Sequence, residues 1–217
     1  MNLETFSELL KRVSAIYEED PINKLVDGTI YWAIKQFPTN NDEQGVLLKI
    51  TLVNTHYRTR IFNINIVKMT QHIYRNSEEI DSKIAKGDLT VVDKIRQGHG
   101  IGKEEGNNLY VFATKYAHFH NQRAFPIFDN LVKDYLSLLN DKDELPFHDE
   151  FTKVSLVRSY STFKSVLDTL ISKLRLTALN YKQIDQGLWL LAKYRLENSL
   201  PEDIATKITA IIRFLPS

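Results

Sequence analysis

The stretch Lys115-Tyr-Ala-His-Phe-His120, followed by Phe125-Pro-Ile-Phe-Asp129-Asn-Leu-Val-Lys133, decides how this chain is expected to fold. Apolar residues before and within it recur at helical spacing, which indicates a helix over residues 108–120 with Lys115 on the shoulder of its apolar face. Pro126 excludes a helix from the connector 121–128. A second helix is expected up to Leu139, with Asp129 at its N-cap, where a carboxylate meets free backbone N–H groups.

The remaining sequence also predicts helices, so we expect an all-α protein. The apolar run Val46–Val53 fits a buried strand or a helix, and we favour a helix because no partner strand is evident. Asn41 is a plausible cap before it, the helix over 152–174 is expected to break near Ser159, and Ser199-Leu-Pro-Glu202 resembles a capping box. We expect one globular domain over residues 1–217, divided into lobes 1–42 with 141–217, and 43–140.

Composition narrows the classes of function. The formal net charge is +1, so no global field draws the chain to nucleic acid or membrane. Residues 51–137 are the basic part, with 12 Lys and Arg against 9 Asp and Glu. The absence of cysteine excludes disulfides, thiolate metal sites and a cysteine-bound iron–sulfur cluster, and we expect no cofactor. The acidic N-terminus and the lack of a long apolar run predict a cytoplasmic protein without a membrane partner.

Lys115 and Asp129 are the first candidates for chemistry. As a functional pair, Asp129 is an ionised carboxylate and Lys115 a nucleophile or a phosphate-binding cation. The structural alternative makes Asp129 a helix cap and Lys115 a solvated surface residue. His118 and His120 suggest a metal at first sight, but residues two apart on a helix point in different directions, so we expect none. Histidines among aromatic residues are more often packed and hydrogen-bonded, and stacking on a base is the alternative.

Two further segments carry weaker signals. The glycine-rich turn Gly98-His-Gly-Ile-Gly102 allows backbone N–H groups to approach a phosphate at the start of the next helix. The basic segment His56–Arg60, together with Lys94, Arg96 and Lys103, suits a nucleic-acid backbone, although a solvated charged surface explains each residue better when it is taken singly.

These motifs resemble the core of the helix-hairpin-helix DNA glycosylases, in which a glycine hairpin is followed by a helix and then by an aspartate at the next helix start. More closely, they resemble an uncharacterised bacterial family distantly related to that superfamily. The resemblance extends over residues 46–193 and is strongest over 98–136. It rests on these segments: Gly100-Ile-Gly102, Phe112-Ala-Thr-Lys-Tyr-Ala-His-Phe-His-Asn121, Phe125-Pro-Ile-Phe-Asp129, Leu52-Val-Asn-Thr-His-Tyr-Arg-Thr59 and Ile184-Asp-Gln-Gly-Leu-Trp189.

The resemblance implies a two-lobed helical fold and a hydrolase of DNA repair that cleaves the N-glycosidic bond of a base flipped out of duplex DNA. Asp129 takes the catalytic aspartate position, and Lys115 is the candidate lysine. The implied base pocket contains Tyr110, His118 and His120. The implied contacts to the DNA backbone are Gly100, Ile101, Gly102, Lys103, Arg58 and Arg60. The alternative is a non-catalytic helical module of the same fold that binds nucleic acid or a protein.

Overall fold

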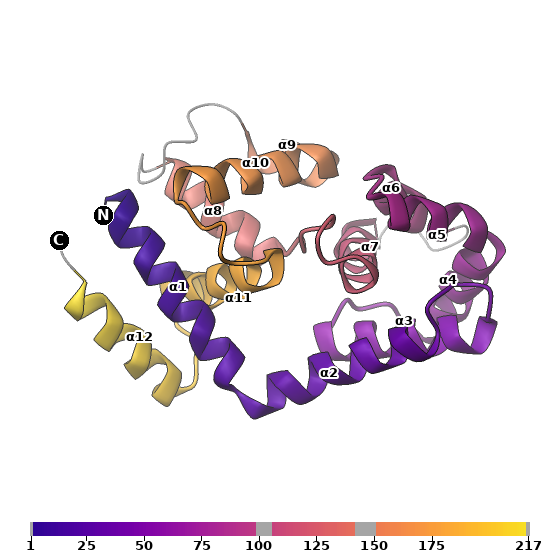
Figure 1. The fold of residues 1–217 in the computed structure, drawn as a ribbon, viewed down its shortest axis with the longest axis horizontal. Helices are drawn as coiled ribbons and strands as arrows, with labels where there is room; N and C mark the ends of the chain where they lie inside the picture. Colours follow the sequence, from indigo (N-terminus) through magenta and orange to yellow (C-terminus); the bar gives the residue numbers. More distant parts are fainter. Residues whose placement is uncertain (1, 99–105, 142–150, 216–217) are drawn as a thin grey trace. The chain divides into compact units, whose positions relative to one another are not determined.

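The computed structural model describes residues 2–98, 106–141 and 151–215, and within these residues all regular secondary structure is helical (Figure 1). The predicted all-α class is therefore confirmed for the described residues. No helix among them is long and apolar enough to cross a membrane. The predicted contacts Gly100, Ile101, Gly102 and Lys103 lie outside the described residues.

The chain divides into two compact units. Unit 1 comprises residues 1–23 and 128–217, and unit 2 comprises residues 24–127. The predicted lobes had different limits: residues 24–42 group with unit 2, and residues 128–140 group with unit 1. Because the connector 121–128 ends at this division, Lys115 belongs to unit 2 and Asp129 to unit 1.

Unit 1 is built around two closely packed helices, α1 (Leu3–Glu19) and α11 (Tyr181–Ala192), which lie side by side in Figure 1. Gly187 allows their close approach, since a Cβ atom there would lie 2.7 Å from Leu10 Cδ1 and 3.1 Å from the Leu10 carbonyl oxygen. The unit also contains α8 (Asn130–Asp141), α9 (Lys153–Arg158), α10 (Tyr160–Lys173), a π-helical turn (Lys193–Glu197) and α12 (Glu202–Phe214).

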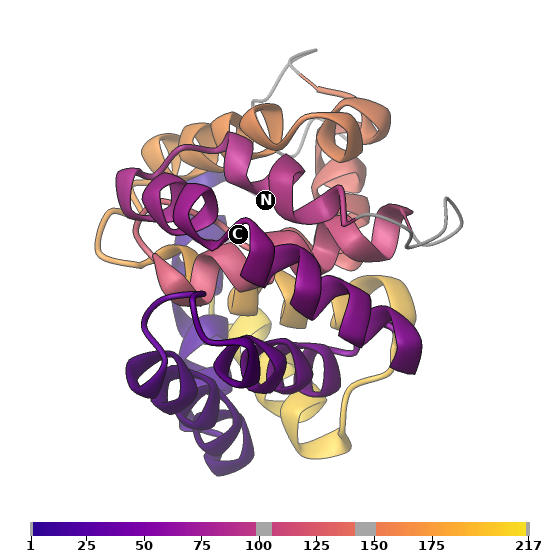
Figure 2. The same ribbon diagram turned by 90° about the vertical axis from the view of Figure 1, so that its right-hand side faces the viewer.

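Unit 2 is built around α7 (Gly106–His120), whose side chains are buried at every position from Leu109 to Phe119. A helix that is buried all round belongs to the interior of a fold. The helices that complete the unit are α3 (Glu43–Tyr57), α4 (Asn63–Arg75), α5 (Ser77–Lys86) and α6 (Thr90–Arg96), with most of α2 (Pro21–Gln36). Figure 2 turns these helices toward the viewer, and both α3 and α6 pack on α7.

Several local predictions are confirmed and two are wrong. The run Val46–Val53 is helical and lies within α3, and the predicted break at Ser159 separates α9 from α10. Asp42, not Asn41, caps α3, because its carboxylate accepts the Gly45 N–H at 2.6 Å. The capping box at Ser199 does not form, since Ser199 Oγ donates to Glu197 and α12 has no side-chain cap.

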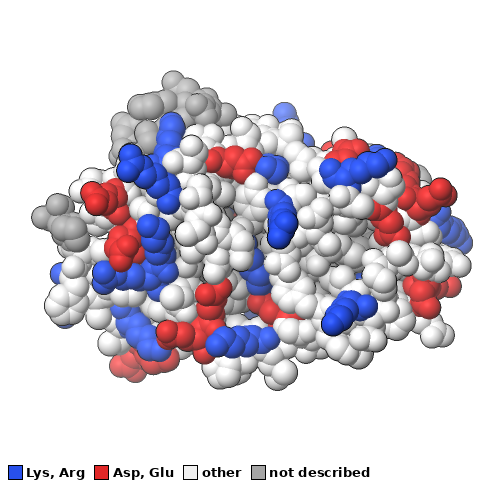
Figure 3. All heavy atoms as spheres, in the orientation of Figure 1, with Lys and Arg blue, Asp and Glu red and all other residues white. Residues whose placement is uncertain are grey.

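Charged side chains of both signs are interspersed on the face of the molecule shown in Figure 3. This distribution agrees with the net charge of +1. A binding surface for an anionic polymer must therefore be sought in individual segments.

Candidate functional site

Lys115 is buried in unit 2, with 3% of its surface exposed. Its ammonium nitrogen lies 4.9 Å from the centre of the Tyr57 ring, which is a cation–π geometry. The prediction that Lys115 lies on a solvated helix shoulder is wrong, because α7 has no solvent-facing side between Leu109 and Phe119. A buried lysine is uncommon, since removing an ammonium group from water is costly.

The aromatic residues near Lys115 form a fixed cluster, which we call the aromatic cluster and define as Tyr31, Tyr57 and Phe119. The Phe119 ring centre lies 5.0 Å from that of Tyr31 and 5.5 Å from that of Tyr57. The Tyr57 hydroxyl donates a 2.7 Å hydrogen bond to the Asp27 carboxylate, which orients the ring that faces Lys115. The cluster thus joins α2, the end of α3 and α7, and its Tyr57 ring faces the Lys115 amine.

Tyr31 adds a polar atom to this cluster. Its hydroxyl is buried and has no hydrogen-bond partner among the described residues. Burial, with the nearby negative charge of Asp27 as a second cause, raises the pKa of the Tyr31 hydroxyl well above its usual range. The hydroxyl is therefore a neutral donor at physiological pH, and it can serve a ligand that reaches this part of unit 2.

The three predicted pocket residues have separate partners. The Arg96 guanidinium lies 5.2 Å from the ring centre of Tyr110, and burial raises the pKa of the Tyr110 hydroxyl. His118 Nδ1 donates to the carbonyl oxygen of Phe125 at 2.7 Å, and His120 Nδ1 donates to that of Tyr116 at 2.8 Å. The His118 bond connects α7 to the connector that follows it, the His120 bond lies within α7, and the two bonds fix both imidazole rings.

His120 is the more perturbed histidine. Burial, reinforced by the positive charge of Lys49, lowers the pKa of its imidazole to about 3, although the bond to Tyr116 opposes the shift. The ring is therefore neutral at pH 7, and its Nε2 is a buried acceptor without a partner among the described residues. No group of three His, Cys, Asp or Glu suited to a metal occurs in the part of the chain that the structure describes.

A second polar cluster in unit 2 surrounds Lys49, which is fully buried within the otherwise apolar run of α3. Its ammonium donates three hydrogen bonds of 2.8–2.9 Å, to the carbonyl oxygens of Phe37 and Thr39 and to Asn40 Oδ1. The Tyr116 hydroxyl donates to the same Asn40 oxygen at 2.6 Å. Sequence reasoning missed this cluster, although a lysine inside an apolar run was a signal for it.

Asn40 connects Lys49 to a carboxylate. Its backbone N–H and its side-chain amide donate to the two oxygens of Asp81 at 2.8 and 2.6 Å. Burial lowers the pKa of Lys49 to about 8, against the attraction of the Asp81 and Asp42 carboxylates. We call Asn40, Lys49, Asp81 and Tyr116 the Lys49 network. It fixes the loop between α2 and α3 onto α7.

Asp129 begins α8 in unit 1, as predicted. Its Oδ1 accepts the N–H of Leu131 at 2.9 Å, and its carbonyl oxygen accepts that of Lys133 at 2.9 Å. The carboxylate therefore satisfies a helix N-terminus. Because Lys115 and Asp129 belong to different units, their functional pairing stays a prediction.

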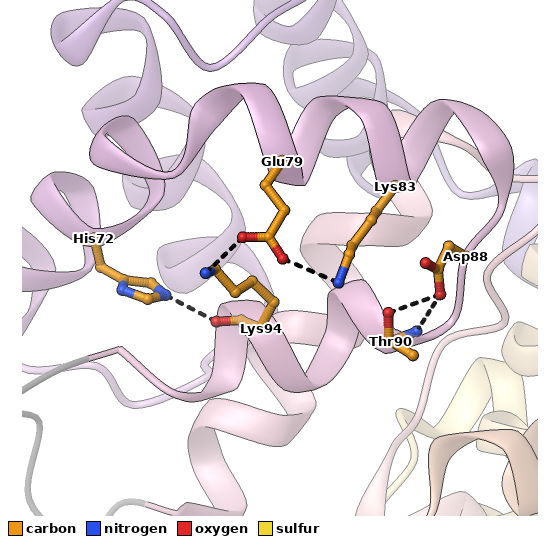
Figure 4. A network of polar contacts seen from close by, with 6 residues as sticks. All are labelled: His72, Glu79, Lys83, Asp88, Thr90 and Lys94. Carbon is orange, nitrogen blue, oxygen red and sulfur yellow. Dashed lines mark hydrogen bonds and ion pairs between the residues drawn. The ribbon is translucent and has the colours of Figure 1, made fainter.

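Two basic residues considered for DNA binding are held inside unit 2. Lys94 forms a 2.6 Å ion pair with Glu79, which also binds Lys83 at 3.0 Å (Figure 4). Figure 4 also shows the Lys94 carbonyl oxygen bonded to His72, which ties α6 to α4. Arg96 lies over Tyr110 and 3.9 Å from Asp93. These interactions give Lys94 and Arg96 structural roles between helices.

Arg58 and Arg60 differ from Lys94 and Arg96. Both are exposed in the loop between α3 and α4, and neither forms an ion pair with a described residue. Both side chains are therefore accessible to solvent, as a contact to the DNA backbone requires.

Residues 8–124 match the HI_0787_N family, which is described as an N-terminal domain. An uncharacterised protein of Haemophilus influenzae is 34% identical over 150 residues, which cover 69% of this chain and 67% of that relative. No solved structure matches the chain at a significant level. The family match contains nearly all of unit 2, including Lys115, the aromatic cluster and the Lys49 network.

Proposed function

This chain belongs to the HI_0787_N family, and we propose that it is a DNA-binding protein of the glycosylase type that acts on a base flipped out of duplex DNA. The motifs around Lys115 and Asp129 resemble the helix-hairpin-helix glycosylases, and these two are the proposed catalytic residues. Lys115 is the proposed nucleophile, and Asp129 the carboxylate that stabilises the positively charged sugar.

The observation that carries the proposal is the burial of Lys115 against Tyr57. A surface lysine would serve DNA only as a point charge, whereas an amine held on an aromatic face has a fixed direction and is shielded from water. In the proposed step, the unprotonated amine forms a bond to C1′ of the sugar while the bond from C1′ to the base breaks. The base leaves with a proton taken from the amine. The C1′–O4′ bond of the sugar then breaks, O4′ takes the remaining amine proton, and the opened sugar stays attached to the lysine as a Schiff base.

The proposed reaction is tested by trapping that Schiff base with borohydride. Duplexes that contain uracil, 8-oxoguanine, an alkylated base or an abasic site are incubated with the wild type, Lys115→Gln and the control Lys83→Gln. Lys83 is a suitable control because it lies in the same unit and is paired with Glu79 on the surface. We expect a covalent adduct with the wild type and the control and none with Lys115→Gln.

Two results would contradict the proposal. An adduct that persists in Lys115→Gln assigns the nucleophile to another lysine. If no duplex gives an abasic product or an adduct with the wild type, the chain is not a glycosylase. The role of Asp129 is tested with Asp129→Asn, because asparagine caps a helix about as well as aspartate but carries no charge.

A non-catalytic nucleic-acid-binding module is the second candidate. It is favoured by the engagement of Asp129 as a helix cap and of His118 and His120 with backbone carbonyl oxygens. This function predicts binding that weakens with salt and releases no base. A salt titration of DNA affinity beside the trapping assay separates the two candidates.

A further inference from the structure

The loop between α3 and α4 is held in one shape by a single side chain, Asn54. Its Oδ1 accepts the Thr59 hydroxyl at 2.7 Å and the Ile61 N–H at 2.9 Å, and its Nδ2 donates to the Ile61 carbonyl oxygen at 2.9 Å. Its own carbonyl oxygen accepts the N–H of Thr59 at 3.2 Å. These four hydrogen bonds attach the loop to the end of α3, although the loop lies at the surface.

We call residues 58–62 the Asn54 loop. The bonds to Asn54 make successive side chains of this loop point alternately outward and inward. Thr59 and Ile61 point inward and are 2% and 3% exposed. Arg58, Arg60 and Phe62 point outward, and Phe62 is 65% exposed. An exposed phenylalanine between arginines and the first turn of α4 has no role in the core of unit 2.

The two arginines occupy backbone conformations that disfavour them. Arg58 has φ +48° and Arg60 has φ +59°, in the left-handed region that glycine or asparagine normally fills at the end of a helix. A loop needed only to join α3 to α4 would be less strained with glycine at these positions. The strain is compatible with a requirement for the arginine side chains themselves.

The sequence on both sides of the Asn54 loop carries only basic charges, and the carboxylate bound to the preceding Tyr57 is that of Asp27 in α2. The chain has no Asp or Glu between residues 44 and 77, whereas Arg58, Arg60, Lys68 and Arg75 fall within that segment. The first turns of α4 also expose apolar side chains, since Ile64 is 66% and Val67 47% exposed. Guanidinium groups beside an exposed aromatic ring match a polyanion whose flat, apolar groups stack, and nucleic acid has that chemistry.

We propose that the Asn54 loop is a duplex-DNA contact in which Arg58 and Arg60 hold phosphates and Phe62 inserts its ring at a base step. The insertion rests on the proposed DNA binding and adds a contact that is independent of Lys115. Apolar side chains that enter a base step unstack it and bend the duplex, which helps to expose a nucleotide for flipping. Asn54 is the positioning residue, since it holds the loop without reaching the DNA.

The test uses a short duplex with 2-aminopurine beside a mismatch, because this base becomes fluorescent when it unstacks. Affinity is measured by fluorescence anisotropy at several salt concentrations. We expect Phe62→Ala to abolish the increase in 2-aminopurine fluorescence and to weaken binding about tenfold, while leaving the salt dependence unchanged. Trp32→Ala is the matched control, because Trp32 is a 54% exposed aromatic residue of α2 in the same unit.

The phosphate contacts are tested with the double variant Arg58→Gly/Arg60→Gly, which removes both charges and relieves both strained conformations. We expect the slope of log affinity against log salt to lose about 1.8 in magnitude, since each phosphate contact contributes about 0.9. Arg12→Gln, which removes an exposed arginine paired with Glu8 in α1, is expected to change neither quantity. Asn54→Ala keeps every charge, and we expect it to weaken binding and reduce the fluorescence signal by freeing the loop.

The outcomes separate the two proposals. If the wild type binds the duplex and Phe62→Ala gives the same fluorescence increase, insertion is overturned while DNA binding stands. An unchanged salt slope in the double arginine variant overturns the phosphate contacts in the same way. If the wild type does not bind the duplex at any salt concentration, the proposed function fails together with this inference.

Discussion

Replacing Lys49 by methionine removes one buried ammonium and keeps an unbranched side chain that is one heavy atom shorter. In the wild type the three N–H groups of the ammonium are all used, on Phe37 O, Thr39 O and Asn40 Oδ1. After the replacement, Asn40 Oδ1 still accepts the Tyr116 hydroxyl, but the two carbonyl oxygens lose the only donors recorded for them among the described residues. The Asp81 carboxylate also loses its nearby positive charge.

The expected cost follows from these losses. Each buried acceptor left without a donor costs about 1–3 kcal/mol, so the two carbonyl oxygens together cost about 2–6 kcal/mol. Methionine recovers part of this amount, because the desolvation of an ammonium no longer opposes folding. We therefore expect Lys49→Met to lower the free energy of unfolding of unit 2 by about 3 kcal/mol at pH 7.

The pH dependence of this cost is a sharper test. The pKa of Lys49 is lowered from 10.5 to about 8 in the folded state. Between these values the unfolded chain binds the Lys49 proton more than the folded chain does, so wild-type stability rises with pH in this window. From pH 8 to pH 9.5 the gain is about 2 kcal/mol, and the variant lacks it. The difference in stability between the two proteins therefore grows by that amount.

Urea unfolding at pH 7, 8 and 9.5 measures this difference. The chain has one tryptophan in each unit, so a Trp189→Phe background leaves Trp32 to report on unit 2 by fluorescence, and circular dichroism follows total helix content. Using the same background in both proteins cancels other titrating groups in the comparison. A stability difference that stays constant from pH 8 to 9.5 would refute the lowered Lys49 pKa. A variant at least as stable as the wild type would refute the structural role of the network.

Three other replacements have defined outcomes. The pKa of His120 is about 3 in the folded chain, so between pH 6.5 and 5 the imidazole takes up a proton only in the unfolded chain. This lowers the free energy of unfolding by about 2 kcal/mol over that pH range, and urea unfolding of His120→Phe should not show this decrease. Asp129→Ala should destabilise unit 1 by about 1 kcal/mol through loss of the α8 cap, and Asp129→Asn by less, as the urea midpoints will show. Gly187→Ala should cost about 1–3 kcal/mol in the same assay because its Cβ atom meets the Leu10 backbone, whereas no loss would mean that α1 and α11 can separate freely.

The positions of the helices were predictable from the sequence, because they depend on local periodicity and capping chemistry. The end of α1 before Pro21, the break at Ser159 and the start of α8 at Asp129 all follow from neighbouring residues. Caps were less secure where several polar residues compete. Asp42 caps α3 in place of Asn41, and Ser199 binds Glu197 instead of a helix N-terminus. Which polar residue forms the cap depends on backbone angles that the sequence does not specify.

The surroundings of the candidate residues were less predictable. Helical periodicity placed Lys115 on a shoulder because the rule assumes that one side of a helix faces water, and α7 has no such side over most of its length. The partners of Lys115 also come from distant parts of the chain, with Tyr57 at the end of α3 and Asp27 in α2. No local pattern contains such contacts.

The sequence by itself determined the all-helical class, the positions of most helix ends, and the candidates Lys115, Asp129 and the basic segment His56–Arg60. Periodicity, proline and capping residues act over a few positions, so these features can be read without a fold. Only the tertiary structure decided that Lys115 is buried on Tyr57, that Lys49 is satisfied by three oxygens, and that Asn54 turns Arg58, Arg60 and Phe62 outward. Burial and hydrogen-bond partners depend on which distant segments pack together, and that choice belongs to the chain as a whole.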